Sequence, residues 1–364
     1  MEYRKLPHGG EMISVIGMGS SVVGAQKEKD IIKTVEYAVE NGINYFDMAG
    51  GHASIFALYG KAFECCRKDV MLQVHFGADY VSGEYGWSTD LETIKRSVAW
   101  QLENLKTDYI DFGFIHCLDE QGDLESYERS GALEYILDMK QQGVVKHLGF
   151  STHSPEMANK LLDKNIIDML MFSINPMYDY GQGDYAIGGS DERYNLYRRC
   201  EKEGVGISVM KPFNAGLLLD EKKSPFHRKL TTAQCIQYCL DKPGVLTVLP
   251  GPGSVSELEE ILHYNEATEE DRDYSVIGTF TPDDSVGKCV YCKHCHPCPA
   301  GLNIGLINKY YDLAKLGDKL AAEHYLTLEK TAEDCISCGH CDSRCPFHVA
   351  QSERMTEICR YFGK

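Results

Sequence analysis

The sequence predicts an α/β fold, a barrel of eight β/α units followed by a small, mainly helical domain. Short β-rich runs alternate with amphipathic helical stretches from Ile13 to about Tyr264, the pattern of a parallel sheet with crossover helices. This rhythm stops around Thr281 to Lys288, ahead of two dense cysteine runs. The chain of 364 residues also exceeds the common size of one domain. We therefore expect a barrel over residues 1–275 and a cysteine-rich domain over residues 276–364.

Eight runs are strand candidates because they are apolar or β-branched and are bounded by turn signals. They are Ile13–Gly17, Ile43–Asp47, Val70–His75, Tyr109–His116, Val145–Ser151, Met169–Ser173, Gly206–Met210 and Leu246–Pro250. Capping boxes predict helix starts at Thr89, Thr231 and Ser256. Eight such units in about 250 residues fit a TIM barrel, whose active site forms at the C-terminal ends of the strands.

A doubly wound dinucleotide-binding sheet is the rival fold. Gly17-x-Gly19 follows the first strand as that fold requires, but the third glycine of its fingerprint would fall at position 22, which is Val22. The barrel therefore explains the sequence better.

Composition argues against several classes of function. The formal net charge of −17 disfavours binding to nucleic acid or to an anionic membrane, because phosphate neutralisation needs clustered Lys and Arg. No run of about 18 apolar residues is present, and the first ten residues hold charges rather than an apolar leader. The 15 cysteines indicate a reducing compartment. We expect a cytoplasmic protein that acts on a small molecule.

The C-terminal region carries two runs of four cysteines, each followed by a proline. The second, Cys335-x2-Cys338-x2-Cys341-x3-Cys345-Pro346, is the bacterial ligand pattern for 4Fe-4S clusters, in which the fourth cysteine reaches over to the other cluster. The first, Cys289-x2-Cys292-x2-Cys295-x2-Cys298-Pro299, has two residues rather than three before its last cysteine. Eight thiolates predict two clusters, one held by Cys289, Cys292, Cys295 and Cys345, and the other by Cys335, Cys338, Cys341 and Cys298.

Two other uses of these cysteines remain open at this point. Structural zinc also takes four thiolates, although its ligands usually form two separated C-x2-C pairs. Disulfides fit less well, because thiols so densely spaced suit metal capture. A helical insert, roughly Ile304 to Glu329, separates the two runs, and it resembles the helical ferredoxin modules of multi-centre redox enzymes. The module would pass electrons within the protein or from a redox partner protein.

Polar residues lie at the predicted strand ends: Asp47, His75, His116, Ser151 and His153, with His52 just beyond Asp47. Four segments around them resemble the aldo/keto reductases. Asn44–Ala49 resembles the family's F-D-T-A after strand two, Asp111–His116 its strand-four histidine, Leu148–Ser151 its strand-five serine, and Met210–Gly216 its strand-seven loop. The likeness runs over most of residues 3 to 264, and with the cysteine runs the whole chain resembles the iron–sulfur branch of that family.

The resemblance implies an oxidoreductase, but two members of the family's catalytic tetrad are replaced. In the family, a Tyr donates a proton to the carbonyl oxygen, a Lys supported by an Asp tunes that Tyr, and a His orients the carbonyl. Asp47 and His116 stand at two of these positions, whereas His52 stands at the tyrosine position and His75 at the lysine position. We therefore expect Asp47, His52, His75 and His116 to be catalytic.

The resemblance also implies a nicotinamide cofactor, NADH or NADPH. Family members hold the carboxamide with Ser and Asn after strand five and a Gln in strand six, and this chain has Ser151, Thr152 and Met171 there. The loop after strand eight could cradle a phosphate at a helix N-terminus, although residues 251–262 contain no Lys or Arg. The expected cofactor-binding residues are Ser151, Asn175, Lys211, Gly251, Gly253 and Ser254.

Three hypotheses of function follow. In the first, His52 replaces the tyrosine as general acid in the reduction or oxidation of a small carbonyl or hydroxyl compound. In the second, His52, His75, His116 and Asp47 bind a divalent metal that polarises the substrate without nicotinamide. In the third, the barrel is a non-catalytic scaffold for electron transfer. A loop over the mouth, Asp179 to Arg193, is expected to supply substrate contacts together with Tyr178, Tyr180 and Tyr185.

Overall fold

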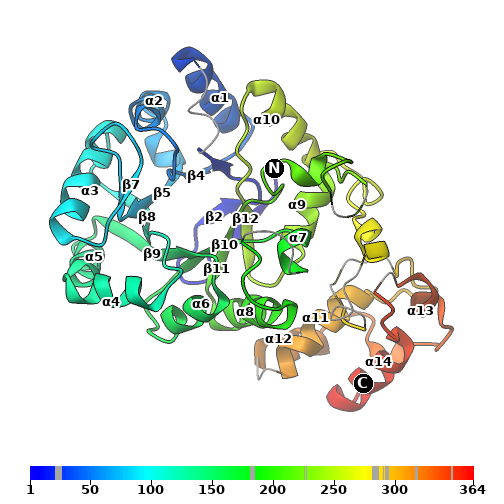
Figure 1. Ribbon diagram of the computed structural model, residues 1–364. Coiled ribbons are helices and arrows are strands. Elements are labelled where there is room, and N and C mark those ends of the chain that lie inside the picture. The colour runs from blue at the N-terminus through cyan, green and yellow to red at the C-terminus, as the bar shows by residue number, and fades with distance from the viewer. Residues whose placement is uncertain are drawn as a thin grey trace.

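A parallel β-barrel wrapped by helices makes up most of the molecule, and a small helical domain packs against one side of it (Figure 1). The computed structural model describes residues 1–20, 27–180, 185–224, 226, 228–280, 287–289, 291, 295–315, 319–345 and 347–364. Position 22, Cys292 and Pro346, on which parts of the sequence interpretation depend, lie outside these residues. No helix in the described part of the chain is both long and apolar enough to cross a bilayer.

Eight parallel strands form the barrel, in the spatial order β12-β11-β10-β9-β8-β5-β4-β3. They are β3 (Met18–Gly19), β4 (Tyr45–Asp47), β5 (Met71–Phe76), β8 (Ile110–Ile115), β9 (Val145–Thr152), β10 (Met169–Ser173), β11 (Gly206–Met210) and β12 (Val245–Val248). The sheet closes on itself where Val248 N donates to Val15 O and Gly17 N donates to Val248 O, both at 2.9 Å. The predicted eight-unit barrel is confirmed.

The first predicted strand is wrong in part. Met12–Ser14 forms β2, which pairs antiparallel with β1 (Tyr3–Lys5) in a hairpin separate from the barrel sheet. The barrel's own first strand, β3, begins only at Met18. The predicted strand Ile13–Gly17 therefore begins in the hairpin and ends beside the barrel sheet. The alternation of its side chains cannot show where one sheet ends and the other begins.

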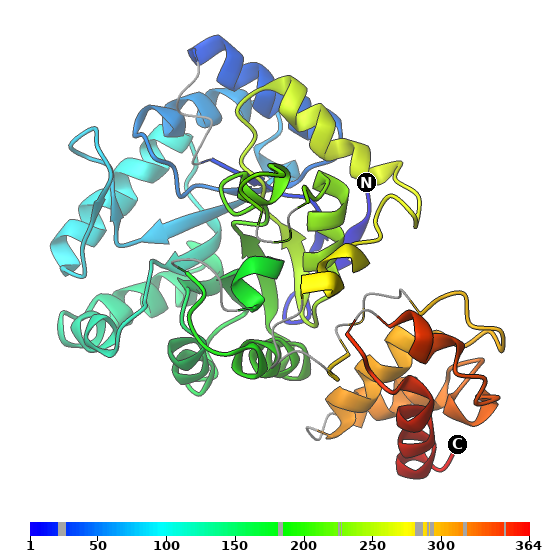
Figure 2. The ribbon, with the colours of Figure 1, turned by 45° about the vertical axis from the view of Figure 1, so that its right-hand side comes forward.

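Helices cover the outside of the barrel (Figure 2). They are α1 (Glu28–Glu40), α2 (Ser54–Ala62), α3 (Leu91–Leu105), α4 (Gln121–Arg129), α5 (Ala132–Gln141), α6 (Pro155–Leu162), α7 (Pro176–Asp179), α8 (Ser190–Glu203), α9 (Thr232–Leu240) and α10 (Val255–Leu262). The cap predicted at Thr231 is confirmed, because its side chain accepts from Gln234 N. The other two caps were misplaced: Asp90 caps α3 and Ser254 caps α10.

The expected mouth loop from Asp179 to Arg193 is shorter than predicted, because a helix occupies each of its two ends. Asp179 is the last residue of α7, and Arg193 lies in the first turn of α8. Their side chains form a fully buried ion pair at 2.8 Å. Residues 181–184 lie outside the described part of the chain.

The C-terminal domain contains α11 (Ile304–Lys315), α12 (Lys319–Leu326), α13 (His340–Arg344) and α14 (Gln351–Phe362) around a hydrophobic core of its own. It packs against α8 of the barrel. Arg198 Nη2 lies 3.0 Å from the Tyr291 hydroxyl, and Lys309 pairs with Glu201 at 2.9 Å. Phe347 and Val349 belong to the same apolar cluster as the barrel helices. The two domains are therefore joined by packing as well as by the chain.

Candidate active site

A hydrogen-bonded carboxylate and imidazole lie inside the barrel at the ends of neighbouring strands. Asp47 ends β4, and His75 lies next to the end of β5, so the parallel pairing of these strands brings them together. Nε2 of His75 is 2.7 Å from Oδ1 of Asp47, and both side chains are buried. His75, expected from the sequence at the family's lysine position, is therefore hydrogen-bonded to the expected aspartate.

Gln73, also on β5, fixes the orientation of this pair. Its Nε2 donates to Asp47 Oδ1 at 2.9 Å. Its Oε1 accepts from the hydroxyls of Tyr45 and Ser208, at 2.7 and 3.2 Å. Two hydroxyl donors on one side of the amide identify the oxygen and turn the NH2 group toward Asp47.

His116 connects the buried pair to the barrel mouth. It follows β8, and its Nδ1 lies 2.9 Å from Nδ1 of His75, with the two rings perpendicular. Burial, and then the neighbouring His75, lower the pKa of His116 well below its usual value, so the neutral imidazole is favoured. Asp47, His75 and His116 therefore form one continuous chain, as their strand-end positions suggested.

Sequence reasoning missed the next member of the chain, Tyr85. It lies between β6 (Ala78–Asp79) and β7 (Gly86–Trp87), a hairpin that follows β5, and its hydroxyl is 2.9 Å from Nε2 of His116. Trp87 Nε1 donates to the backbone oxygen of His116 at 3.2 Å. The available signal was an aromatic residue in a glycine-bounded turn directly after a catalytic strand.

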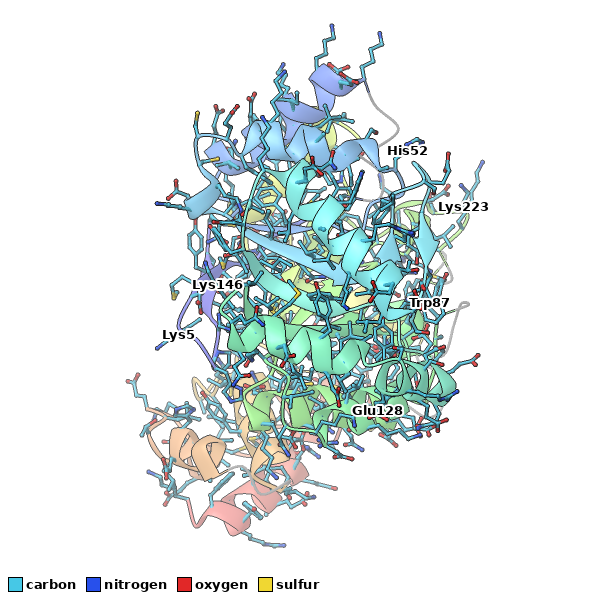
Figure 3. All side chains as sticks on the ribbon, turned by 90° about the vertical axis from the view of Figure 1, so that its left-hand side faces the viewer. Lys5, His52, Trp87, Glu128, Lys146 and Lys223 are labelled. Atoms are coloured by element: carbon cyan, nitrogen blue, oxygen red, sulfur yellow. The ribbon has the colours of Figure 1, made fainter. Side chains whose placement is uncertain are left out.

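His52 is placed differently from the other three expected catalytic residues. It is exposed at the rim, where its backbone forms an isolated bridge with Glu84. Figure 3 shows it at the same end of the molecule as Trp87 and Lys223, opposite Lys5 and Lys146. Among the described residues, no hydrogen bond or ion pair to its side chain is found. The structure therefore brings Asp47, His75 and His116 together but leaves His52 apart.

The four-residue metal site expected from His52, His75, His116 and Asp47 does not form as a ligand cluster. Both ring nitrogens of His75 are engaged, one with Asp47 and one with His116. Within the described part of the chain, three potential ligand atoms come within 4.8 Å of one another only at Cys117, Asp119 and His153.

Those three residues are held by hydrogen bonds to one another. The Cys117 thiol lies 3.6 Å from Asp119, whose carboxylate also accepts from the backbone N and Nδ1 of His153, at 2.7 and 2.9 Å. Burial opposes ionisation of Asp119, but the bonds from His153 outweigh it and lower its pKa to about 2. Burial raises the pKa of Cys117 to about 12, so its thiol stays protonated. The cluster anchors the loops that follow β8 and β9.

An aromatic ring covers this side of the mouth. Tyr185 stacks on His153 with ring centroids 4.4 Å apart, and Nζ of Lys211 lies 3.4 Å from the centre of the Tyr185 ring. Burial lowers the pKa of Lys211. Tyr178 and Tyr180, by contrast, are buried rather than displayed to a substrate.

The expected cofactor-binding residues are largely engaged within the protein. Ser151 Oγ accepts from Cys117 N at 2.8 Å. Asn175 caps α7 and donates to Lys211 O at 2.9 Å. At the start of α10, Gly253 N donates to Glu257, and Ser254 Oγ accepts from Glu257 N. The exposed Glu257 carboxylate thus accepts a backbone N–H that a phosphate at Gly251–Ser254 would also use.

Most of the cluster cysteines that the structure describes fit the expected crossing of the two runs, but Cys295 lies in the same apolar cluster as Cys298, Cys335 and Cys341. A single small cavity is lined by Cys335, Cys338 and Cys341 of the second run and by Cys298 of the first. Cys289 and Cys345, from different runs, both pack against the apolar cluster of the barrel. Thiolates grouped in this way are the donor set of a 4Fe-4S cluster.

Known proteins match both domains. Residues 15–235 match the aldo/keto reductase family, and residues 285–349 match the 4Fe-4S dicluster domain. L-galactose dehydrogenase from Arabidopsis thaliana is 27% identical over 293 residues, with 71% of this chain and 86% of that protein covered. The uncharacterized oxidoreductase YqkF from Bacillus subtilis is 26% identical over 283 residues, with 71% and 90% covered.

A solved structure agrees in fold. The holo form of aldo-keto reductase AKR11C1 from Bacillus halodurans superposes with a TM-score of 0.63 at 23% identity, covering 78% of this chain and 97% of that one. The family match spans more than half of the present chain and includes Asp47, His75 and His116. This chain therefore belongs to the aldo/keto reductase family and is an oxidoreductase of that type that carries a 4Fe-4S dicluster domain after its barrel.

Proposed function

We propose that the barrel mouth interconverts a small carbonyl compound and the corresponding alcohol, with acid–base chemistry centred on His116. The observation that carries the proposal is the hydrogen-bonded chain from the buried Asp47 through His75 to His116. Any carbonyl-to-alcohol conversion needs a proton at the oxygen, and two imidazoles backed by a carboxylate are suited to move one. The L-galactose dehydrogenase relative acts, by its name, on a hydroxyl compound.

The rim of the mouth supports a substrate with some apolar surface. Tyr85, Trp87, Tyr185 and Ile187 are each about two-fifths to half exposed, at 48%, 42%, 40% and 39%. Exposed aromatic side chains beside a substrate site are typical of ligand contact. His52 lies on this rim as well, at the position where the resemblance to the family implies a proton donor.

The two clusters are the proposed electron source. Cys298, Cys335, Cys338 and Cys341 would hold one, and Cys289, Cys292, Cys295 and Cys345 the other. Each bound cluster supplies or accepts single electrons, so two together match the two electrons of a carbonyl reduction, in which one proton is added at the oxygen and a second, from solvent, at the carbon. The absence of Lys and Arg from residues 251–262, and the use of Gly253 N by Glu257, favour this route over a dinucleotide. A redox partner protein would then reload the clusters.

The test uses full-length protein with reconstituted clusters, handled without oxygen. The clusters are reduced chemically, a panel of small aldehydes and ketones is added, and the return of the oxidised clusters' visible absorbance is followed. We expect carbonyl-dependent re-oxidation with alcohol formed in step, and its loss in His116→Ala. The matched control, His263→Gln, changes an exposed histidine after α10 and should behave as wild type.

Two results would contradict the proposal in different ways. Alcohol formation that requires NADH or NADPH and leaves the clusters reduced would overturn the electron route but keep the reaction class. Absence of alcohol with every donor would overturn the reaction class itself.

A further inference from the structure

The hairpin β6–β7 places one phenol at the end of the buried hydrogen-bond chain. The Tyr85 hydroxyl lies 2.9 Å from Nε2 of His116, while the ring is 48% exposed at the mouth. Asp47 lies at the other end of the chain and is 5% exposed. The chain therefore runs from the barrel interior to the surface where a substrate would bind.

The phenol is not needed to hold the hairpin in place. Trp87 Nε1 already donates to the His116 backbone, and Arg96 pairs with Asp79 at 3.3 Å. Ser97 Oγ donates to Ala78 O at 2.7 Å. The buried ring of Tyr80 packs against Trp100 beneath the hairpin. With these anchors present, the contact between Tyr85 and His116 calls for another explanation.

The hydrogen bonds of the chain fit one consistent arrangement of protons. With Asp47 ionised, His75 Nε2 carries a proton and donates to it, which leaves Nδ1 of His75 as an acceptor. His116 Nδ1 then donates to His75 Nδ1, and Nε2 of His116 is left as an acceptor. Tyr85 completes the series by donating its hydroxyl proton to that nitrogen. These tautomers follow when Gln73 Nε2, which lies 3.0 Å from Nε2 of His75, donates to Asp47 rather than to His75.

We infer that Tyr85 is the catalytic residue that exchanges a proton with the substrate oxygen, and that His116, His75 and Asp47 move this proton to and from the barrel interior. The inference deepens the proposed function and rests on it. Tyr85 comes from the hairpin after strand three, whereas the family's tyrosine position, after strand two, is His52. The proton donor would thus lie on a different loop from the one that the family uses, while His116 keeps its position at the end of its strand.

The proton balance can be written for alcohol oxidation. The O–H bond of the substrate breaks and a new O–H bond forms at Tyr85, whose own proton passes to Nε2 of His116. The Nδ1 proton of His116 passes to Nδ1 of His75. The Nε2 proton of His75 then passes to Asp47, which becomes a carboxylic acid. The C–H bond at the same carbon also breaks: a hydride acceptor would take this hydrogen with its electron pair, whereas the clusters would take two single electrons and the proton would pass to solvent. Carbonyl reduction is the reverse.

This route keeps both imidazoles neutral before and after the transfer. Each histidine gives up one proton and receives one, so only its tautomer changes. A charged imidazolium at His116 would be costly, because its ring is largely removed from water and adjoins a second histidine. The arrangement therefore moves a proton through a buried region without leaving a positive charge there.

The first test compares Tyr85→Phe with His52→Ala in reduction of benzaldehyde by the anaerobic holoprotein, using whichever donor supports the wild type. We expect Tyr85→Phe to lower kcat/KM by about 10²–10⁴-fold, the usual contribution of a general acid. His52→Ala tests the rival donor, and a smaller loss of kcat/KM than that of Tyr85→Phe supports Tyr85. Tyr3→Phe is the matched control, because this tyrosine is also partly exposed but lies on the separate β1–β2 hairpin.

The opposite ranking would overturn the inference while leaving the proposed function intact. If His52→Ala loses activity and Tyr85→Phe does not, His52 is the proton donor. Unchanged cluster absorbance and thermal midpoint in Tyr85→Phe would exclude misfolding as the cause of a loss.

A second readout does not depend on turnover. Ultraviolet absorbance of tyrosinate, taken as wild type minus Tyr85→Phe, isolates the titration of the Tyr85 phenol. Replacing the acceptor, in His116→Ala compared with His116→Ala/Tyr85→Phe, should move that titration to lower pH, since a hydrogen bond from the neutral phenol is lost. An unmoved titration would overturn the relay. If the wild type reduces no carbonyl at all, the proposed function fails, and this titration still decides whether the relay exists.

Discussion

Asp47 and His75 are 2.7 Å apart inside the barrel, at the positions where the resemblance to the family implies an aspartate and a lysine. A lysine ammonium only donates hydrogen bonds, so it ends a chain of them. Imidazole has two nitrogens and can donate from one while accepting at the other. The replacement therefore keeps the partner of the aspartate and adds a connection from it to His116.

Asp47→Asn should impair turnover more than binding. An asparagine in this position can accept the hydrogen bond of His75 but cannot take up its proton, so the end of the relay is blocked. We expect kcat to fall by about 10²-fold or more with KM little changed, because Asp47 is too deep to contact substrate. Steady-state kinetics measure both, and the exposed Asp108→Asn is the control. A rise in KM at constant kcat would assign Asp47 to binding instead.

Crossed ligation of the clusters can be tested with single cysteine variants. If Cys298 belongs with Cys335, Cys338 and Cys341, then Cys298→Ala and Cys338→Ala should lose the same cluster although they lie in different runs. Cys289→Ala should lose the other one. Each variant should retain about half of the iron. Iron analysis and electron paramagnetic resonance of the reduced protein identify the missing cluster, and the exposed Cys65→Ala is the control. Different lost signals for Cys298→Ala and Cys338→Ala would contradict the crossing.

The sequence predicted the site where backbone pairing alone determines position. Asp47, His75 and His116 lie at the ends of the successive neighbours β4, β5 and β8, so a correct strand assignment brings them together. Strands β10 and β11 were predicted with their observed bounds for the same reason, since each is a short apolar run between clear turns.

Positions that depend on loops could not be predicted. Tyr85 reaches His116 because a hairpin folds back over the mouth, and no local pattern encodes that direction. His52 lies five residues after the end of β4 and just before α2, which begins at Ser54. The chain turns into that helix in a direction that leaves His52 exposed. Asp179 and Arg193 looked like polar loop residues, because a buried ion pair cannot be distinguished from two exposed charges in one sequence.

The Asp179–Arg193 pair should be important for stability. Asp179 also accepts from the hydroxyls of Tyr197 and Tyr238, at 2.6 and 2.7 Å, so one carboxylate joins α7, α8 and α9. Asp179→Asn would leave the Arg193 charge buried without its partner, at a cost of about 3–5 kcal/mol. Thermal or urea unfolding measures the change.

A surface ion pair provides the matched control for that variant. Asp163 pairs with Arg199 at 2.6 Å, but its side chain is 70% exposed. Asp163→Asn should therefore cost only about 0–1 kcal/mol. Equal effects of the two substitutions would show that the buried pair has no special role.

His147 should make stability depend on pH. It lies near the start of β9, between Glu11 at 2.9 Å and Asp168 at 3.8 Å. Burial by itself lowers the pKa of His147, but its contacts with Asp168 and Glu11 outweigh burial and raise the pKa above its usual 6.5. A raised folded-state pKa means that the folded state holds the proton more tightly than the unfolded state does. The stabilisation is therefore complete below about pH 6.5 and is lost as pH rises through the folded-state pKa.

Urea unfolding of wild type and His147→Gln at several pH values checks this sign. The wild type should exceed the variant in stability most at slightly acidic pH, and the difference should shrink in alkaline buffer as the wild-type histidine loses its proton. Buffers above about pH 5.5 keep Glu11 and Asp168 ionised in both states, so their own lowered pKa values do not contribute. His263→Gln, at an exposed position, should show no such trend. A difference that grows with pH would mean that His147 is held neutral in the folded protein, with burial outweighing its two carboxylate partners.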